Sequence, residues 1–300
     1  MDVAAQRSAC RSGRHRRRRA DGGCDPPQPT PAGESPDPAV HARRRRAAHR
    51  CRRVPRSPRV EPRAVTPPHG RIAIIGAMPE EIATLLPNLE EAVATRVGPF
   101  ELHDGRLDGH DVTLAVCGVG KVNAAALTQA LLGRGATAVL FTGVAGAVDP
   151  DLAVGDVVIS TDAVQHDVNV VPLGYQPGEV PGEPLAWPAD PALVAAAHAA
   201  AKHAVEDAHV ILGRIASGDV FLADPDGVAA LRSRFGAACA EMEGAAVAHV
   251  CARWTVPWVV VRSISDTADH DASVDFRAFT KVAAQRAERV VRAVLAQLPA

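Results

Sequence analysis

Short apolar runs that end in small residues recur along residues 71–266 and alternate with segments of helical periodicity. The runs include RIAIIGAM (Arg71–Met78), ATAVLFTGVAG (Ala136–Gly146) and VPWVVVRSISD (Val256–Asp266). Such runs are typical of strands buried on both faces, and their alternation with helices predicts a sheet covered by helices. The sequence therefore predicts an α/β fold in which ligands bind beyond the carboxyl ends of the strands.

Helices are expected in the segments between these strands. One is expected in PEEIATLLPNL, where Pro79 and two glutamates suit a first helical turn. Others are expected in VNAAALTQALLGRG, PALVAAAHAAAKHA, DPDGVAALRSRF and GAAVAHVCARW, with a long amphipathic helix near the C-terminus. Residues 172–191 are rich in proline and glycine and predict a long loop.

Charge is divided unevenly between the first 70 residues and the rest of the chain. Residues 1–70 carry 17 arginines against 6 acidic residues, whereas residues 71–300 carry 16 basic residues against 28 acidic ones. The first segment lacks apolar periodicity, so we expect residues 1–70 to be a disordered Arg/Pro-rich tail. Three interpretations of it stay open: an arm that binds nucleic acid or anionic lipid, a targeting segment, or a start codon assigned too far upstream.

Residues 71–300 are long enough for one domain with a sizeable core. No apolar run reaches the ~18 residues that a membrane span needs. The six cysteines, at positions 10, 24, 51, 117, 239 and 251, form no CxxC pair and no zinc-type spacing. They predict reduced, structural thiols in a cytoplasmic protein.

Polar and aromatic residues follow several of the predicted strands. In chain order these residues are Glu81, Gly118–Gly120, Gly143–Gly146, Phe221, Glu241–Glu243, Arg262 and Asp266. A cleft lined by them would be rich in carboxylates and poor in basic groups, whereas a phosphate-binding cleft offers more Arg or Lys. Glu241 and Glu243 are two residues apart, so they would share a face if their strand stays regular.

Each of these residues also has a purely structural interpretation. The glycines can form tight turns, Glu81 can complement a helix dipole, Phe221 can belong to the core, and Asp266 can cap the next segment. His166 and Asp167 can be an ordinary turn pair. Convergence of the acids on one edge of the sheet favours a functional site.

The motifs IAIIGAMPEEIATL, VCGVGKVNAA, FTGVAG, SGDVFL, AEMEGAAVAHVC and VVVRSISDTAD stand in a recognisable order. Over residues 71–298 the chain resembles the 5'-methylthioadenosine/S-adenosylhomocysteine nucleosidases of the purine nucleoside phosphorylase and uridine phosphorylase superfamily. The resemblance implies a single domain with a central mixed β-sheet flanked by helices, and a homodimer. No metal or organic cofactor is expected, and no nucleic acid or membrane partner for residues 71–300.

The implied reaction is hydrolysis of the N-glycosidic bond of 5'-methylthioadenosine and/or S-adenosylhomocysteine, in methionine salvage and nucleoside catabolism. Glu81 matches the residue that positions and deprotonates the attacking water. Asp266 matches the general acid that protonates adenine, with a pKa raised by burial, and Ser265 is expected to orient it by a hydrogen bond. Glu243 matches the ligand of the ribose hydroxyls, and Arg262 is expected to hold Glu243 in place.

The resemblance also implies a binding pocket. Met242 is expected against the ribose, Phe221 against the adenine ring, and the Leu222 backbone at the base edge. The wall for the 5'-alkylthio group is expected from Ala77, Met78, Val119 and Phe276. The partner subunit is expected to close this pocket with Val170, Leu173 and Pro181.

The chain departs from the family at positions that bear on this pocket. Val144 stands where well-known members have a serine, so the backbone of Val144–Gly146 is expected to hold the water or the sugar. Leu173 replaces a bulkier aromatic residue of some relatives, which leaves the preferred 5' substituent open. The role of Glu241 also stays open between support of the site and pairing with backbone donors.

Three alternatives compete with this assignment. A purine nucleoside phosphorylase of the same superfamily would require phosphate, and a futalosine-type nucleosidase would prefer a carboxylated 5' group. A nucleoside-binding protein that acts through its Arg-rich tail would show salt-sensitive binding to DNA and no turnover. The carboxylate of Glu81 favours the hydrolase, because it would repel phosphate.

Overall fold

The computed structural model describes residues 70–267 and 272–298, so the predictions made for residues 1–69 lie outside the described part. Within that part the strands form a mixed sheet, as the family resemblance implied. For example, β1 is parallel to β4 and β5, whereas β3 is antiparallel to β2 and β4. The strands are β1 (Ile72–Gly76), β2 (Glu90–Val97), β3 (Phe100–Leu107), β4 (His110–Val116), β5 (Ala138–Ala147), β6 (Val157–Gln165), β7 (Trp187–Pro188), β8 (Val210–Ser217), β9 (Ala237–Glu241) and β10 (Trp258–Asp266).

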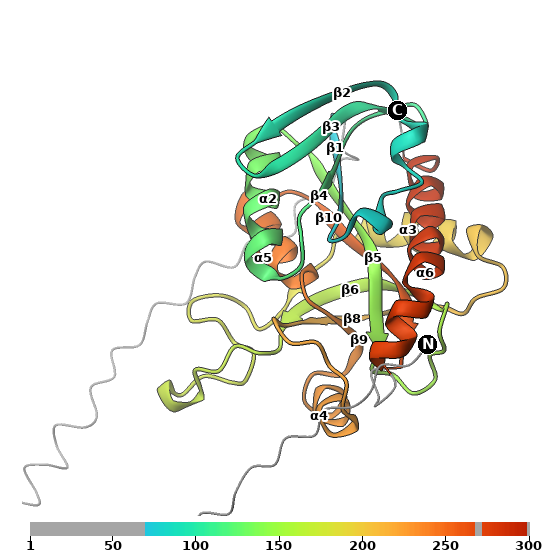
Figure 1. Ribbon diagram of the computed structural model, residues 1–300. Coiled ribbons are helices and arrows are strands. Elements are labelled where there is room, and N and C mark those ends of the chain that lie inside the picture. The colour runs from blue at the N-terminus through green and yellow to red at the C-terminus, as the bar shows by residue number, and fades with distance from the viewer. Residues whose placement is uncertain (1–69, 268–271, 299–300) are drawn as a thin grey trace, which may run out of the picture. The chain divides into compact units, whose positions relative to one another are not determined.

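Part of the sheet closes on itself into a ring of strands. β5 pairs with β9, β9 with β8, β8 with β6 and β6 with β10, and β10 returns to β5. β5 also pairs with β1, and from there the sheet continues through β4 to the hairpin of β3 and β2 (Figure 1). Strands that are far apart in the sequence therefore end beside one another.

Helices cover both faces of the sheet (Figure 1). They are α2 (Lys121–Gly133), α3 (Pro191–Ala204), α4 (Pro225–Phe235), α5 (Gly244–Trp254) and α6 (Ala272–Leu295). Asp190 and Asp224 cap α3 and α4 by accepting hydrogen bonds from backbone N–H groups, and a proline follows each of them in the first turn. Gly236 ends α4 in the left-handed conformation, which glycine adopts without steric penalty.

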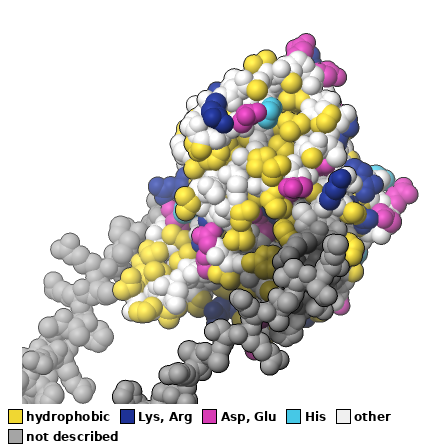
Figure 2. Space-filling model, in the orientation of Figure 1, with side chains coloured by type: hydrophobic (Ala, Val, Ile, Leu, Met, Phe, Trp, Pro, Cys, Tyr) yellow, Lys and Arg dark blue, Asp and Glu magenta, His cyan; other side chains and the backbone are white. Residues whose placement is uncertain are grey.

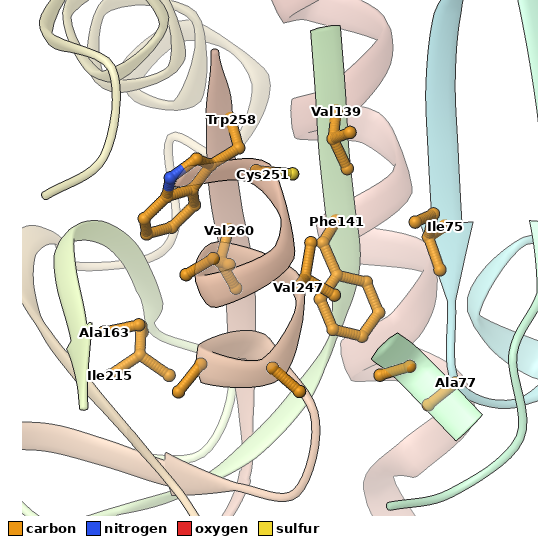
Figure 3. Close-up of a cluster of buried hydrophobic side chains, with 14 of the residues drawn as sticks. Ile75, Ala77, Val139, Phe141, Ala163, Ile215, Val247, Cys251, Trp258 and Val260 are labelled. Carbon is orange, nitrogen blue, oxygen red and sulfur yellow. The ribbon is translucent and has the colours of Figure 1, made fainter. Parts of the chain in front are cut away.

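Alternate residues of each central strand point to opposite faces and build two buried clusters. On one face, Ile75, Phe141 and Val260 belong to the cluster that contains Val247 and Cys251 of α5 (Figure 3). The residues next to them in the same strands pack with α3 and α6 on the other face. The predicted burial of these strands on both faces is confirmed.

The prediction of an α-helix after β1 is wrong. The segment instead forms two short 3-10 turns, η1 (Pro79–Glu81) and η2 (Leu86–Asn88). Pro87 lacks the N–H that a continuing α-helix needs, and it disfavours helical geometry in the residue before it. The Glu81 carboxylate folds back onto the N–H groups of Ala77 and Met78, so η1 serves to place this side chain.

The other predicted helices are present close to their predicted positions. Residues 172–191 form mainly turns, as predicted, with the 3-10 turn η3 (Val171–Leu173) and the short strand β7 at their ends. The hairpin of β2 and β3 was not predicted. No helix among the described residues is long and apolar enough to cross a membrane.

Candidate active site

A cavity of about 270 Å³ lies at the carboxyl ends of β1, β5, β9 and β10. It brings together all the predicted catalytic and substrate-binding residues of this chain except Arg262, which is buried behind its wall. Sequence reasoning missed Val220 and Ala240, whose only signal is that they adjoin predicted residues, whereas Ala145 lies within the predicted stretch Val144–Gly146. The lining residues are Ala77, Met78, Glu81, Val119, Val144, Ala145, Gly146, Val220, Phe221, Leu222, Ala240, Glu241, Met242, Glu243, Ser265, Asp266 and Phe276.

Glu81 is buried and is fixed by three backbone donors. Its Oε2 accepts hydrogen bonds from the N–H groups of Ala77 (2.6 Å) and Met78 (2.9 Å), and its Oε1 accepts one from Val144 (3.0 Å). Burial raises the pKa of Glu81, while the charge of Arg262 and these hydrogen bonds oppose the shift. The result is an immobile carboxyl group in the cavity wall that can exchange a proton with a bound ligand.

Gly143 allows the Glu81 carboxylate to approach Arg262. A Cβ atom at position 143 would lie 2.5 Å from Oε1 of Glu81 and 2.9 Å from Nη1 of Arg262, which is closer than real Cβ contacts. A tight turn is one interpretation of the glycines of FTGVAG from the sequence, but Gly143 lies inside β5. Its missing side chain makes room for two charged groups.

Arg262 pairs with Glu241, and the prediction that it holds Glu243 is wrong. Nη2 of Arg262 donates to Oε2 of Glu241 at 2.6 Å, and the guanidinium lies over the Phe141 ring, 4.0 Å from its centroid. The cause is the end of β9: Glu241 is its last residue, whereas Glu243 is already the N-cap of α5. The two glutamates line one cavity but bind different partners.

The role of Glu241, left open by the sequence, is structural support. Its Oε2 accepts a hydrogen bond from the Gly244 N–H at 2.7 Å, and its Oε1 accepts one from the Ser217 hydroxyl. Ser217 in turn accepts from the Ala245 N–H at 2.7 Å. Glu241 therefore satisfies the first N–H groups of α5 and fixes the start of that helix.

Glu243 is buried at the start of α5 and is tied to a distant segment. Its Oε1 accepts a hydrogen bond from the N–H of Gly120 at 2.7 Å. Burial raises the pKa of Glu243 to about 8, with a further contribution from the charge of Glu241 and opposition from Arg262. Burial thus favours the protonated form of this carboxyl group in the free protein.

Asp266 ends β10 and is 2% exposed. The Ser265 hydroxyl donates to its Oδ2 at 2.8 Å, so the hydrogen bond predicted between these neighbours is present. Phe221 and Phe276 pack edge to face with their centroids 5.6 Å apart. Phe221 is 46% exposed, so much of its ring stays accessible beside the cavity.

Val144 contributes its backbone and an apolar side chain to the site. The side chain forms a small buried cluster with Ala283 and Ala284 of α6, against which Met78 and Phe276 pack. Because the Val144 N–H donates to Glu81, the backbone at this position supports a carboxylate although the side chain has no hydroxyl.

Val170, Leu173 and Pro181, predicted to act in a partner's pocket, are not among the residues that line this chain's own cavity. They belong to the loop around η3, where Leu173 is 73% exposed. Figure 2 shows hydrophobic side chains gathered at the lower left of the described surface, where this loop projects in Figure 1.

The residues that the structure describes contain no group of three or more His, Cys, Asp or Glu side chains placed to hold a metal ion. Cys117, Cys239 and Cys251 are buried and free. Burial raises the pKa of each thiol, which makes these cysteines poor nucleophiles.

The mixed α/β sheet, with buried carboxylates at its strand ends, fits a protein of the phosphorylase superfamily. Residues 71–296 match the profile of the phosphorylase superfamily. Over 230 residues the chain is 44% identical to a 5'-methylthioadenosine/S-adenosylhomocysteine nucleosidase of Geobacillus sp. (strain WCH70), which covers 76% of this chain and 99% of that relative. The chain belongs to the family of 5'-methylthioadenosine/S-adenosylhomocysteine nucleosidases.

The solved structures with a similar fold include the following two. One is a nucleosidase of the same name from Neisseria meningitidis in complex with methylthio-immucillin-A, with a TM-score of 0.74, 39% identity, and coverage of 77% of this chain and 100% of that chain. The other is a futalosine hydrolase of Helicobacter pylori strain 26695, with a TM-score of 0.73, 33% identity, and coverage of 76% and 98%.

Proposed function

We propose that this chain hydrolyses the N-glycosidic bond of 5'-methylthioadenosine and/or S-adenosylhomocysteine, releasing adenine and a 5-thioribose sugar. The main support is that Glu81, Glu243 and Asp266 line one cavity, whose described lining contains no lysine or arginine. Arg262, the cation behind this lining, is already paired with Glu241. Phosphate sites rely on Arg or Lys donors, so a lining without them favours water over phosphate as the nucleophile.

The leaving group requires a proton, because cleavage of the bond to N9 leaves negative charge on adenine. In the proposed mechanism Asp266 donates this proton to N7 of adenine, and Ser265 orients its carboxyl group. General-acid help of this kind is worth about 10²–10⁴-fold in rate. Phe221 stacks on the adenine ring, and the backbone of Leu222 binds the base edge.

In the same mechanism, Glu81 acts on the attacking water and Glu243 binds the sugar. Glu81, fixed by its backbone donors, positions the water and takes its proton. Glu243, once ionised, accepts hydrogen bonds from the 2'- and 3'-hydroxyls and stabilises the positive charge that develops on the sugar. Met242 lies against the ribose. The hydrogen-bond partner of Arg262 is Glu241, and through Glu241 it helps to fix the start of α5.

The 5'-alkylthio group is assigned to an apolar wall. In this chain the wall consists of Ala77, Met78, Val119 and Phe276. The exposed loop around η3 supports the proposal that a second subunit completes it with Val170, Leu173 and Pro181, so that the active form is a homodimer. Light scattering of the purified protein tests the dimer, and Leu173→Asp is expected to weaken both the dimer and binding of the alkylthio group.

The remaining assignments follow from the same activity. We place the enzyme in the cytoplasm, assign the activity to residues 71–300 as the nucleosidase domain, and expect no metal or organic cofactor. Release of adenine is accordingly expected to persist in excess chelator. It is also expected to persist when residues 1–70 are removed, and loss of turnover on that truncation would contradict the domain assignment.

The decisive experiment is a substrate panel assayed for free base by chromatography, with and without phosphate. We expect release of adenine from 5'-methylthioadenosine or S-adenosylhomocysteine without phosphate. A strict phosphate requirement would instead show a phosphorylase. The likeness to a futalosine hydrolase makes futalosine the second candidate substrate, and preference for it would reassign the specificity.

A further inference from the structure

The loop between β8 and α4 places Phe221 at the cavity and has no regular secondary structure at residues 218–224. The path of this loop is fixed near its beginning, by a hydrogen bond at Asp219. The N–H of Asp219 donates to Oδ2 of Asp167 at 2.9 Å. Asp167 lies just beyond the end of β6 and outside the cavity lining, so this anchor is separate from the site already described.

Asp167 is held in turn by Lys121, the first residue of α2. Nζ of Lys121 lies 2.5 Å from Oδ1 of Asp167, and the two side chains are only 16% and 22% exposed. Burial acts to raise the pKa of Asp167, but the hydrogen bonds from Lys121 and from the Asp219 N–H hold it below its ordinary value. Asp167 is therefore a fixed carboxylate near neutral pH.

Further hydrogen bonds connect Asp219 to Glu243, the acid assigned to the sugar. Oδ1 of Asp219 accepts from the backbone N–H of Lys121 at 2.8 Å. The N–H of the preceding residue, Gly120, donates to Oε1 of Glu243 at 2.7 Å. The start of α2 thus connects the loop that carries Phe221 with the carboxyl group of Glu243.

His166 restrains the loop from the neighbouring position. Its ring lies against Gly218, where any Cβ atom would collide with the imidazole. Its backbone N–H donates to the carbonyl of Ser217 at 3.0 Å. His166 and Asp167, which can be interpreted as a turn pair from the sequence alone, therefore hold two consecutive residues of this loop, Gly218 and Asp219.

We propose that Asp167, with Lys121 as its counter-ion, is a positioning residue that sets the place of Phe221 relative to Glu243. The inference rests on the proposed function, which assigns Phe221 to the base and Glu243 to the ribose. Asp167 does not line the cavity, so it acts only through the loop. Its loss therefore weakens binding of adenine more than it slows bond cleavage.

Two substitutions of Asp167 remove its interactions to different degrees, and a third substitution, at another residue, is the matched control. Asp167→Ala removes both the ion pair and the acceptor for the Asp219 N–H, whereas Asp167→Asn keeps an oxygen that can accept from that N–H. The control is Asp162→Asn, in β6 itself. Asp162 pairs with Arg214 at 2.7 Å and is 23% exposed, which matches the 22% of Asp167, and it does not line the cavity.

Kinetics, adenine binding and a probe on the loop together test the proposal. For Asp167→Ala we expect the KM for 5'-methylthioadenosine and the Kd for adenine to rise about tenfold, the order set by one charge-assisted hydrogen bond, with kcat changed less than about threefold. Asp167→Asn is expected to lie between Asp167→Ala and the wild type. A 4-fluorophenylalanine at position 221 is expected to give a fluorine resonance that broadens or shifts in Asp167→Ala and is unchanged in Asp162→Asn.

The outcomes separate this inference from the proposed function. Unchanged KM, adenine affinity and fluorine resonance in a folded Asp167→Ala protein would overturn the positioning role, as would equal changes in Asp162→Asn. If the wild-type protein fails to release adenine from any nucleoside, the proposed function fails. The fluorine spectra of Asp167→Ala and Asp162→Asn still decide whether Asp167 fixes the loop.

Discussion

Arg262 and Glu241 meet through a 2.6 Å contact between Nη2 and Oε2, with side chains only 1% and 3% exposed. Burial acts to lower the pKa of Arg262, but the charges of Glu241, Glu81 and Glu243 raise it above its ordinary value. Arg262 is thus the buried counter-charge of Glu241, and its charge also acts on the neighbouring acids Glu81 and Glu243. Its position sets the electrostatics of the cavity although it does not line the cavity.

Arg262→Met is expected to lower the free energy of unfolding by about 3–5 kcal/mol, because it removes the ion-pair partner of the buried Glu241 side chain. Urea unfolding followed by circular dichroism measures this loss. Arg292→Met is the control, since it breaks a pair with Asp108 whose side chains are 41% and 23% exposed and is expected to lose less than about 1 kcal/mol. Equal losses in the two variants would contradict the importance of the buried pair.

Glu81→Gln is expected to reduce kcat for adenine release by about 10²–10⁴-fold, because a neutral amide cannot take the proton of water. Glu80→Gln is the matched control in the same turn η1, since Glu80 is exposed and outside the cavity. Asp266→Asn removes the proposed acid and is expected to lose activity over the same range. Full activity in both Glu81→Gln and Asp266→Asn would refute the proposed mechanism.

Gly143→Ala is expected to reduce hydrolysis by more than about 100-fold, because the new Cβ lies 2.5 Å from the present position of Oε1 of Glu81 and must displace the catalytic base. Gly133→Ala is the control: no heavy atom lies within 4 Å of its added Cβ, and we expect unchanged turnover. Steady-state kinetics decide the matter. A fully active Gly143→Ala protein would show that the close approach at Gly143 is not needed.

The raised pKa of Glu243, about 8 against an ordinary 4.5, predicts stability that falls as pH rises. Between these two values the folded protein holds a proton that the unfolded chain has released, so the free energy of unfolding decreases by up to about 1.4 kcal/mol per pH unit. Glu243→Gln removes this titration and is expected to flatten the profile. Urea unfolding at about pH 5, 6, 7 and 8 tests this, and identical slopes in both proteins would contradict it.

Binding of the nucleoside is expected to tighten over the same pH range. The ribose hydroxyls donate to the ionised form of Glu243, so binding must release the proton that the free protein holds. Isothermal titration with a non-hydrolysable nucleoside analogue, repeated in buffers of different ionisation enthalpy, measures that release. Absence of proton release near pH 7 would show that Glu243 is already ionised in the free enzyme.

The sequence predicted which residues line the site better than it predicted which side chains pair with one another. The residues after β1, β5, β9 and β10 were found because buried strands have a clear apolar pattern and ligands bind at their ends. The pairing of Arg262 was missed because the spacing of Glu241 and Glu243 cannot show that β9 ends between them. The pairing of strands that are distant in the sequence depends on closure of the ring, and no local sequence pattern indicates that closure.

Two local features were missed for a different reason. The segment after β1 has the composition of a helix start, yet Glu81 bonds to the backbone of Ala77 and Met78 and Pro87 interrupts the helix. The hairpin of β2 and β3 lacks a regular apolar face, since most of β2 is exposed. Tertiary contacts, and not local preference, determine both segments.

The ring of strands has a consequence for how the enzyme becomes active as it folds. β10 must pair with both β5 and β6, which precede it by a long stretch of chain, and such pairings form slowly because the entropy of loop closure is lost before the contacts form. Asp266 reaches Glu81 and Glu243 only when that last strand is in place. A refolding chain is therefore expected to bind or cleave a nucleoside only after the ring of strands has closed.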